Sequence, residues 1–336
     1  MSVTAIKSDV AVRTKLRPLE AFFEQDDVTE ISVNRPKEVW IARQGQPYMQ
    51  RQDVPELDLG HLNTLADLVA QYSDQEVDAE HPLLSGKLPN GYRVQVIKTP
   101  AVESGLIALS IRKPAILDVD LDWYEEHQAF RHVNKRQTTE AELEQSLRAA
   151  YGEERYKDFI VQAVRGRKNI IVSAGTDTGK TTFLNAALKA VDERERIITI
   201  EDTREVRLKQ PNALHLLASR GSQGLSKATQ EDLLRACLRL RPNRIVMGEI
   251  RGAEAFAYLN VINSGHPGSL TTIHADSVEL AWERLALMVL EARTPMTKSE
   301  VKDYLRLVVP IIVQWTKDEM GNRFIAEIYY AGAERT

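Results

Sequence analysis

One stretch decides the fold of this chain: Asn169-Ile170-Ile171-Val172-Ser173-Ala174-Gly175-Thr176-Asp177-Thr178-Gly179-Lys180-Thr181-Thr182. Its first six residues form an apolar, β-branched run that predicts a buried strand, and apolar residues at helical spacing follow Thr181. A strand, a glycine-containing turn and a helix start bring backbone N–H groups and the positive end of a helix dipole to one point. Residues 175–182 are therefore predicted to bind phosphate, with Lys180 on the β- and γ-phosphates and the Thr181 hydroxyl on Mg²⁺.

The loop departs from the usual pattern G-x-x-x-x-G-K-[ST] at two places. Counting back from Gly179 puts Ala174 at the first position, and Gly175 follows it immediately. Because alanine tolerates most backbone regions except positive φ, we expect the turn to close. Asp177 places a carboxylate inside a loop that binds anions, so we expect it to point to solvent or to cap a backbone N–H. The sequence leaves open how far the two residues slow nucleotide turnover.

Composition is that of a globular protein and excludes several other classes. The 336 residues suffice for two domains, and 43% hydrophobic and 27% charged residues are ordinary values. A net charge of −4 gives no general attraction to nucleic acid or acidic lipid. The single cysteine, Cys237, excludes an internal disulfide or a multi-cysteine zinc site. The chain has no apolar run of spanning length and no secretory signal, so we expect a cytoplasmic protein with at most peripheral membrane association.

Three parts are expected along the chain: an N-terminal α+β domain at 1–113, a linker with some helix at 114–155, and a RecA-like ATPase domain at 156–336. In the first part, strands are expected at 28–33, 38–43, 92–96 and 106–112, with helices at 16–25 and 57–72. Apolar periodicity is weak in the second part, which favours a linker over a core. In the third, strands near 169, 197, 244 and 270 alternate with helices, as in a largely parallel α/β sheet.

Two of these strands end in carboxylates. The strand 197–200 runs into Glu201 and Asp202, and the strand 244–247 runs into Gly248 and Glu249. Parallel strands present their carboxyl ends at one edge of the sheet, which is where ligands bind in such folds. One acid would position a water bound to Mg²⁺, and the other would orient or deprotonate the attacking water. We therefore take Glu201 and Glu249 as catalytic candidates and, with Thr181, as metal candidates.

Histidines and arginines complete the set of candidates. His266 lies in a glycine-rich turn and His274 at the end of the strand that follows, where either could contact or report a γ-phosphate. We include His274 and Lys180 among the catalytic residues. Phosphoryl transfer also gains from a cation that another subunit supplies. The sequence does not choose among the arginine candidates, which are Arg93, Arg112, Arg204, Arg220, Arg241 and Arg251.

The order of these motifs resembles that of the secretion-superfamily ATPases, and most closely the traffic ATPases of bacterial type IV secretion and conjugation systems. In the second half of the chain the resemblance rests on residues 175–182, 200–205, 238–242, 248–251 and 265–276. In the first half it rests on 28–36, 38–40 and 110–113. It covers about 11–113 and 156–330.

This resemblance implies an Mg²⁺-dependent ATPase that forms a hexameric ring at the cytoplasmic face of the inner membrane. Its partners would be other copies of itself, inner-membrane components of a type IV secretion apparatus, and a coupling ATPase. Glu201 and Glu249 match the two acidic boxes, and His274 matches the histidine box. Arg93 and Arg112 match N-terminal-domain positions near the bound ATP. The long linker is similar to that of members in which the RecA-like domain packs against a neighbour's N-terminal domain.

Three alternatives remain open on the sequence. A related motor of a type IV pilus or of type II secretion is disfavoured, because type II ATPases usually carry a tetracysteine module. A nucleotide-dependent switch or docking adaptor with little turnover is kept open by Asp177. A DNA translocase gains little support, since the chain is acidic and has no basic patch interleaved with aromatic residues, and we expect no direct sequence-specific nucleic-acid binding.

Overall fold

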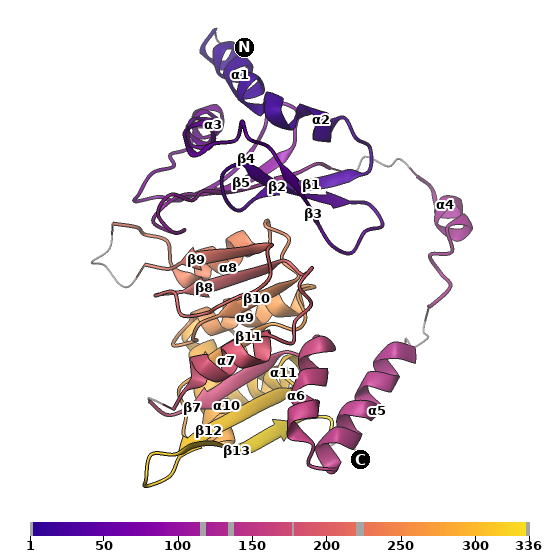
Figure 1. Ribbon diagram of the computed structural model, residues 1–336, viewed down its shortest axis with the longest axis vertical. Coiled ribbons are helices and arrows are strands. Elements are labelled where there is room, and N and C mark those ends of the chain that lie inside the picture. The colour runs from indigo at the N-terminus through magenta and orange to yellow at the C-terminus, as the bar shows by residue number, and fades with distance from the viewer. Residues whose placement is uncertain (1–2, 115–118, 134–137, 177, 220–224, 334–336) are drawn as a thin grey trace.

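Two β-sheets organise the chain in this computed structural model, one of six strands and one of seven. The structure describes residues 3–114, 119–133, 138–176, 178–219 and 225–333. Figure 1 shows the first sheet and its helices above the second domain, with the connecting segment descending along one side. Within the described ranges no helix combines the length and the apolar character needed to cross a membrane.

The N-terminal domain is an antiparallel sheet covered by helices. Its elements are α1 Val3–Leu16, a 3₁₀ turn Arg17–Leu19, α2 Glu20–Phe23, β1 Val28–Val33, β2 Glu38–Arg43, β3 Gln50–Asp53, α3 Leu59–Tyr72, β4 Leu83–Lys87, β5 Arg93–Ile97 and β6 Ala108–Arg112. The strand order is β3-β2-β1-β6-β5-β4. The expected strands and the helix near 57–72 are present, and α1, β3 and β4 are additional. Helix α3 begins where the Asp58 side chain accepts a hydrogen bond from the His61 N–H (2.7 Å).

The two faces of this sheet have different partners. Alternate residues such as Ile31, Leu109 and Val94 form an apolar core with α1 and α3. The residues between them, such as Glu30 and Ser110, are polar but also buried. This polar face is turned toward the second domain (Figure 1). Ile97 and Ala108 on this face pack into the core of the second domain, so the two domains are joined through both polar and apolar groups.

Named contacts hold the two domains together. The Arg196 Nη1 of the second domain donates to the Asn34 Oδ1 of the first at 2.8 Å. The Leu217 N–H donates to the Ala101 carbonyl at 2.8 Å. Burial raises the pKa of Glu30, which lies near the Arg196 guanidinium. The connection therefore includes buried polar contacts as well as the apolar contacts of Ile97 and Ala108 with the core of the second domain.

The segment between the domains holds two helices, α4 Leu121–Glu126 and α5 Thr138–Gly152. Figure 1 shows α4 standing away from both domains, whereas α5 lies beside α6. The weak apolar periodicity of the sequence indicates a solvated linker, yet Leu147 and Ala150 of α5 are fully buried. The Tyr151 hydroxyl of α5 also donates to the Ile328 carbonyl at 2.8 Å. A short apolar stripe suffices here because α5 covers the second domain with one narrow edge.

The second domain has helices on both faces of a largely parallel sheet, the α/β arrangement expected of a RecA-like core. Its elements are α6 Tyr156–Arg165, β7 Ile170–Ala174, α7 Lys180–Leu188, β8 Ile197–Glu201, β9 Ala213–Leu217, α8 Gln230–Cys237, β10 Arg244–Met247, α9 Glu254–Asn263, β11 Leu270–Ile273, α10 Val278–Glu291, α11 Lys298–Val308, β12 Ile311–Lys317 and β13 Arg323–Tyr330. The strand order is β13-β12-β7-β11-β10-β8-β9, and only β13 runs antiparallel to its neighbour.

Successive residues of each central strand enter different cores. Ile198 and Ile245 pack with the core that contains α8 to α11, whereas Ile197 and Val246 pack with α5, α6 and α7. Because both faces are covered, the strands are almost continuously apolar, which is why the sequence showed them clearly.

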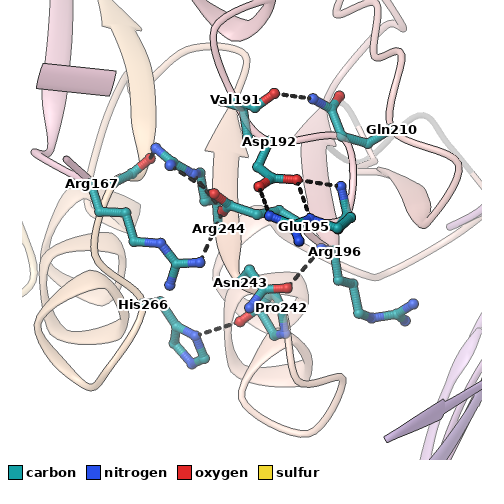
Figure 2. A network of polar contacts seen from close by, with 12 residues as sticks. Arg167, Val191, Asp192, Glu195, Arg196, Gln210, Pro242, Asn243, Arg244 and His266 are labelled. Atoms are coloured by element: carbon teal, nitrogen blue, oxygen red, sulfur yellow. Dashed lines mark hydrogen bonds and ion pairs between the residues drawn. The ribbon is translucent and has the colours of Figure 1, made fainter. Parts of the chain in front are cut away.

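A buried ion pair lies where these strands begin. Arg244, the first residue of β10, is fully buried and donates to both carboxylate oxygens of Glu195, at 2.7 and 3.0 Å. It also donates to the carbonyls of Val164 (2.7 Å) and Gly268 (3.1 Å). Figure 2 shows Arg167 approaching the same carboxylate from another side. We call Arg244, Glu195 and Arg167 the arginine node; it joins α6, β10 and the turn before β11.

Candidate nucleotide site

The phosphate loop connects the end of β7 to the start of α7, as the sequence predicts (Figure 1). Gly179 precedes the helix with φ of 91°, a left-handed conformation that a residue with a side chain adopts only under strain. The Thr178 hydroxyl donates to the Gly175 carbonyl at 2.9 Å and closes the turn. Ala174 is the last residue of β7, in extended backbone, so its methyl group is tolerated. Asp177 lies outside the described residues.

Lys180 is held inside the loop by three neighbours. Its Nζ donates to the carbonyls of Gly175 (3.1 Å) and Ala174 (3.4 Å) and to the His274 Nδ1 (3.1 Å). The residue is only 9% exposed, and this burial lowers the pKa of Lys180. A cation held by weak carbonyl acceptors is poised to exchange them for phosphate oxygens, which bind it more strongly.

His274 links this lysine to the second acidic strand end. Its Nε2 lies 3.2 Å from the Glu249 Oε1. Burial lowers the pKa of His274, which favours the neutral ring. The Lys180 Nζ lies 3.1 Å from Nδ1 and 3.3 Å from Nε2, so it does not select one ring nitrogen as its acceptor. The His274 ring thus lies between the loop cation and the Glu249 carboxylate and contacts both.

Arg251 organises the carboxylates at this edge of the sheet. Its guanidinium donates to the Glu249 Oε2 at 2.9 Å and to the Asp202 Oδ2 at 2.7 Å. It therefore joins the ends of β10 and β8. The Glu249 carboxylate is oriented from one side by Arg251 and from the other by His274, which leaves it little freedom.

Glu201 is anchored differently, by the chain that follows it. Its Oε1 accepts the N–H groups of Glu205 and Val206, both at 2.8 Å, and its Oε2 accepts the Thr199 hydroxyl at 3.1 Å. Burial raises the pKa of Glu201, and the two N–H groups oppose that shift. Gly248 allows this position, because a Cβ there would lie 3.2 Å from the Glu201 Cγ.

These groups face one cavity of about 490 Å³. The loop supplies Thr176, Thr178, Gly179, Lys180, Thr181 and Thr182, and the strand ends supply Glu201, Asp202, Glu249 and His274. Arg323, at the start of β13, also lines it, and nothing in the sequence singled that residue out. The cavity thus brings together the candidates from the loop, both acidic strand ends and the histidine strand.

The donors for a divalent cation suit Mg²⁺. Thr181, Glu201 and Glu249 all line the cavity and offer oxygen atoms. The Thr181 hydroxyl donates to the Glu205 Oε2 at 3.0 Å. Among the described residues, the one tight cluster of acidic and histidine ligands is elsewhere, at the exposed Glu76, Asp78 and His81. Mg²⁺ commonly takes one or two carboxylates together with substrate phosphates, and the cavity offers that kind of donor.

Several other candidates lie away from the cavity. His266 contacts the Pro242 carbonyl through its Nδ1 (3.0 Å), beside the arginine node (Figure 2). It precedes β11 whereas His274 follows it, so the expectation that His266 could contact a γ-phosphate is wrong. Arg204 pairs with Glu103, and Arg241 donates to Thr29. Arg220 lies outside the described residues.

The two N-terminal-domain arginines do not reach this cavity either, since every described residue that lines it comes from the second domain. Arg93 and Arg112 are exposed and directly opposite each other on β5 and β6. Like charges at such a pair are unfavourable by themselves, and Arg112 also lies opposite the carboxylate of Glu30 on β1.

Comparisons with known proteins show the family to which this chain belongs. A family model described as type II/IV secretion system protein matches residues 13–323. The chain is 37% identical to the type IV secretion system protein VirB11 of Bartonella quintana, over 95% of this chain and 92% of that one. It is also 37% identical to VirB11 of Brucella suis, over 97% and 92%.

A solved structure is similar throughout. It is the crystal structure of the VirB11 ATPase from the Brucella suis type IV secretion system in complex with sulphate. It superposes with a TM-score of 0.90 and 36% identity, covering 98% of this chain and 97% of that chain. The likeness therefore includes both domains and the segment between them.

Proposed function

Because this chain belongs to the type II/IV secretion system protein family, we propose that it is an Mg²⁺-dependent ATPase that works as a hexameric motor of a type IV secretion apparatus. The observation that carries this proposal is the contact series Lys180–His274–Glu249, which places a cation, an imidazole and a carboxylate side by side at the phosphate loop. The relatives that are similar over the full length are themselves named type IV secretion system proteins.

The residues divide the work of ATP hydrolysis between binding and water activation. The loop N–H groups and the α7 N-terminus receive the polyphosphate. Lys180 leaves the carbonyls of Ala174 and Gly175 for the β- and γ-phosphates, where its charge stabilises the transferring group. Glu249, oriented by His274 and Arg251, aligns the attacking water. When Lys180 moves to the phosphates, it would lose its contact with the His274 ring, so the position of His274 would depend on whether phosphate is bound.

Bound Mg²⁺ would neutralise developing charge on the phosphate oxygens. Thr181, Glu201 and Glu249 would hold it, directly or through water. Glu201 suits this role because its two N–H bonds fix the carboxylate in advance.

A second subunit would complete each site. Arg93 and Arg112 form an exposed cationic pair that their own chain leaves away from the cavity. In a ring, the N-terminal domain of a neighbour would bring this pair to the nucleotide. Helix α4 lies apart from both domains (Figure 1), as expected of a connecting segment that would cross from one subunit to the next. Such a ring would lie peripherally at the cytoplasmic face of the inner membrane, with membrane components of the apparatus and a coupling ATPase as partners.

Replacing Glu249 by glutamine separates binding from turnover. Glu249→Gln keeps the size of the side chain but removes the charge that orients water. We expect steady-state ATP hydrolysis to fall about 100-fold or more, with binding of a fluorescent ATP analogue preserved. Glu279→Gln, an exposed residue at the start of α10, is the matched control and should hydrolyse ATP normally. Wild-type turnover no higher than that of Lys180→Ala would instead favour the switch or adaptor function.

Subunit mixing tests whether sites are shared between copies. Lys180→Ala damages the second domain, and Arg93→Ala/Arg112→Ala damages the first, so each variant alone is expected to be inactive. Suppose that each site combines the second domain of one subunit with the N-terminal domain of its neighbour. In a random equal mixture of the two variants, both of these domains are then intact at about one quarter of the sites. ATP hydrolysis should then return to roughly that fraction. Mixing Lys180→Ala with Glu249→Ala, both in the second domain, should restore nothing. Mass photometry of the same samples gives the subunit count.

No recovery in the first mixture, with mixed rings verified by mass, would contradict shared sites and would place the nucleotide between domains of one chain. Motor function itself would survive that result.

A further inference from the structure

Glu201 is linked to the edge of the sheet by a pair of hydrogen bonds that the proposed mechanism does not use. Thr199, fully buried on β8, donates its hydroxyl to the Glu201 Oε2 at 3.1 Å. The same Thr199 Oγ1 lies 2.8 Å from the Nδ1 of His215 on β9. Thr199 and His215 are direct neighbours in the parallel pairing of β8 with β9. The contact is thus built into the register of the two strands.

The directions of these hydrogen bonds follow from the chemistry of each group. Burial raises the pKa of Glu201, but its Oε1 accepts two backbone N–H groups, and these contacts favour the ionised carboxylate. An ionised carboxylate only accepts, so Thr199 must use its single proton on Glu201. The Thr199 oxygen can then only accept from His215, and the His215 Nδ1 must carry a proton.

The His215 ring supplies this proton while neutral. Burial lowers the pKa of His215 to about 4, so the imidazole carries one proton near neutral pH. That proton is on Nδ1, which leaves Nε2 without one. The half-buried ring therefore acts through hydrogen-bond direction and not through charge.

The neighbourhood of His215 connects it to the other domain. Strand β9 is the edge of the second sheet, and residue 102 of the N-terminal domain bridges to Leu216 there. The Leu217 N–H donates to the Ala101 carbonyl at 2.8 Å. The N-terminal domain thus pairs with the strand that carries His215, along its free edge.

We propose that His215 is a positioning residue for Glu201, which it orients through the Thr199 hydroxyl from the strand to which the N-terminal domain is attached. The proposal rests on the proposed function, because Glu201 matters to turnover only if the cavity hydrolyses ATP. We call the hydrogen-bonded series His215–Thr199–Glu201 the relay. With the relay intact, both carboxylate oxygens of Glu201 are fixed before the nucleotide binds. Without it, Oε2 loses its partner and the carboxylate is held by Oε1 alone.

The first experiment determines which nitrogen of the His215 ring carries the proton, and it does not require ATP hydrolysis. Nitrogen-15 NMR of histidine-labelled wild-type protein distinguishes the two neutral tautomers, and His215→Asn assigns the signal among the seven histidines. We expect the Nδ1–H tautomer at His215 and a change to Nε2–H in Thr199→Val. An Nε2–H ring in the wild type would overturn the proposal whether or not the protein is an ATPase.

The second experiment tests the consequence for Glu201. In Thr199→Val, hydrogen exchange at the amides of residues 205 and 206 should accelerate, since they donate to a carboxylate that has lost its other support. Turnover number should fall about 10-fold, the usual order for a lost supporting contact, with KM for ATP little changed. Thr199→Ser and His215→Asn keep the required donors and should recover most of the turnover. Thr64→Val, on the exposed face of α3, controls for the substitution itself.

The two ways of failing are distinct. Unchanged exchange and unchanged turnover in Thr199→Val would reject a positioning role for His215 while leaving the ATPase intact. A wild type without ATP hydrolysis would reject the proposed function, whereas the tautomer and the amide exchange would still report on the relay.

Discussion

Lys180→Ala is expected to lower steady-state ATP hydrolysis about 100- to 1,000-fold, the usual cost of removing one preorganised donor to a developing charge. Lys180 is the cation that the cavity holds deepest, between the carbonyls of Ala174 and Gly175 and the His274 ring. Alanine removes both the phosphate contact and the link to His274. Nucleotide affinity should therefore also fall, unlike in Glu249→Gln. Phosphate release and titration with a fluorescent ATP analogue measure the two effects.

The matched control is Lys189→Ala, an exposed lysine at the end of the same helix. It removes the same charge from α7 without touching the cavity, and its turnover should equal that of the wild type. If Lys180→Ala retained more than a tenth of wild-type turnover, the loop would not be the site of hydrolysis. Equal losses in both variants would point to a general effect of charge on α7.

The positions of the site residues could be expected from the sequence because each lies at the end of an apolar strand. Glu201, Glu249 and His274 follow β8, β10 and β11, and parallel strands present these ends at one edge. The structure does bring them to one cavity, and their catalytic roles stay predictions. The fold class is also confirmed. Strands that are covered on both faces are continuous apolar runs, and such runs can be recognised in the sequence.

What the sequence could not show depends on contacts between distant segments. Arg323 reaches the cavity because the hairpin β12–β13 returns beside the phosphate loop, where a Cβ on Gly179 would lie 3.7 Å from the Arg323 Cδ. The four residues of β3 are polar and exposed, so no apolar alternation marks them, and only pairing with β2 makes them a strand. His266 resembled a site residue because it lies close to His274 in the sequence, but strand β11 separates the two and leaves them at its opposite ends.

The sequence did not indicate the arginine node either, because an arginine at the start of a strand is usually exposed. Arg244 is instead fully buried, and its donors are used by Glu195 and by the carbonyls of Val164 and Gly268. Gly268 tolerates this approach, since a Cβ there would lie 2.5 Å from the Arg244 Nη1. A buried pair of this kind is not strongly stabilising in itself, but removing one partner leaves the other charge buried and unpaired.

Arg244→Met is therefore expected to destabilise the second domain by about 3–5 kcal/mol, as measured by denaturant unfolding followed by tryptophan fluorescence. The methionine fills part of the space, but the Glu195 carboxylate keeps only the 3.4 Å contact with Arg167. The double variant Arg244→Met/Glu195→Met removes both charges, and we expect it to recover most of the loss. Arg167→Ala is the control: its side chain is about a third exposed, so the cost should stay within about 1 kcal/mol. A double variant as unstable as Arg244→Met would show that the carbonyl bonds of Arg244, and not the unpaired carboxylate, carry the effect.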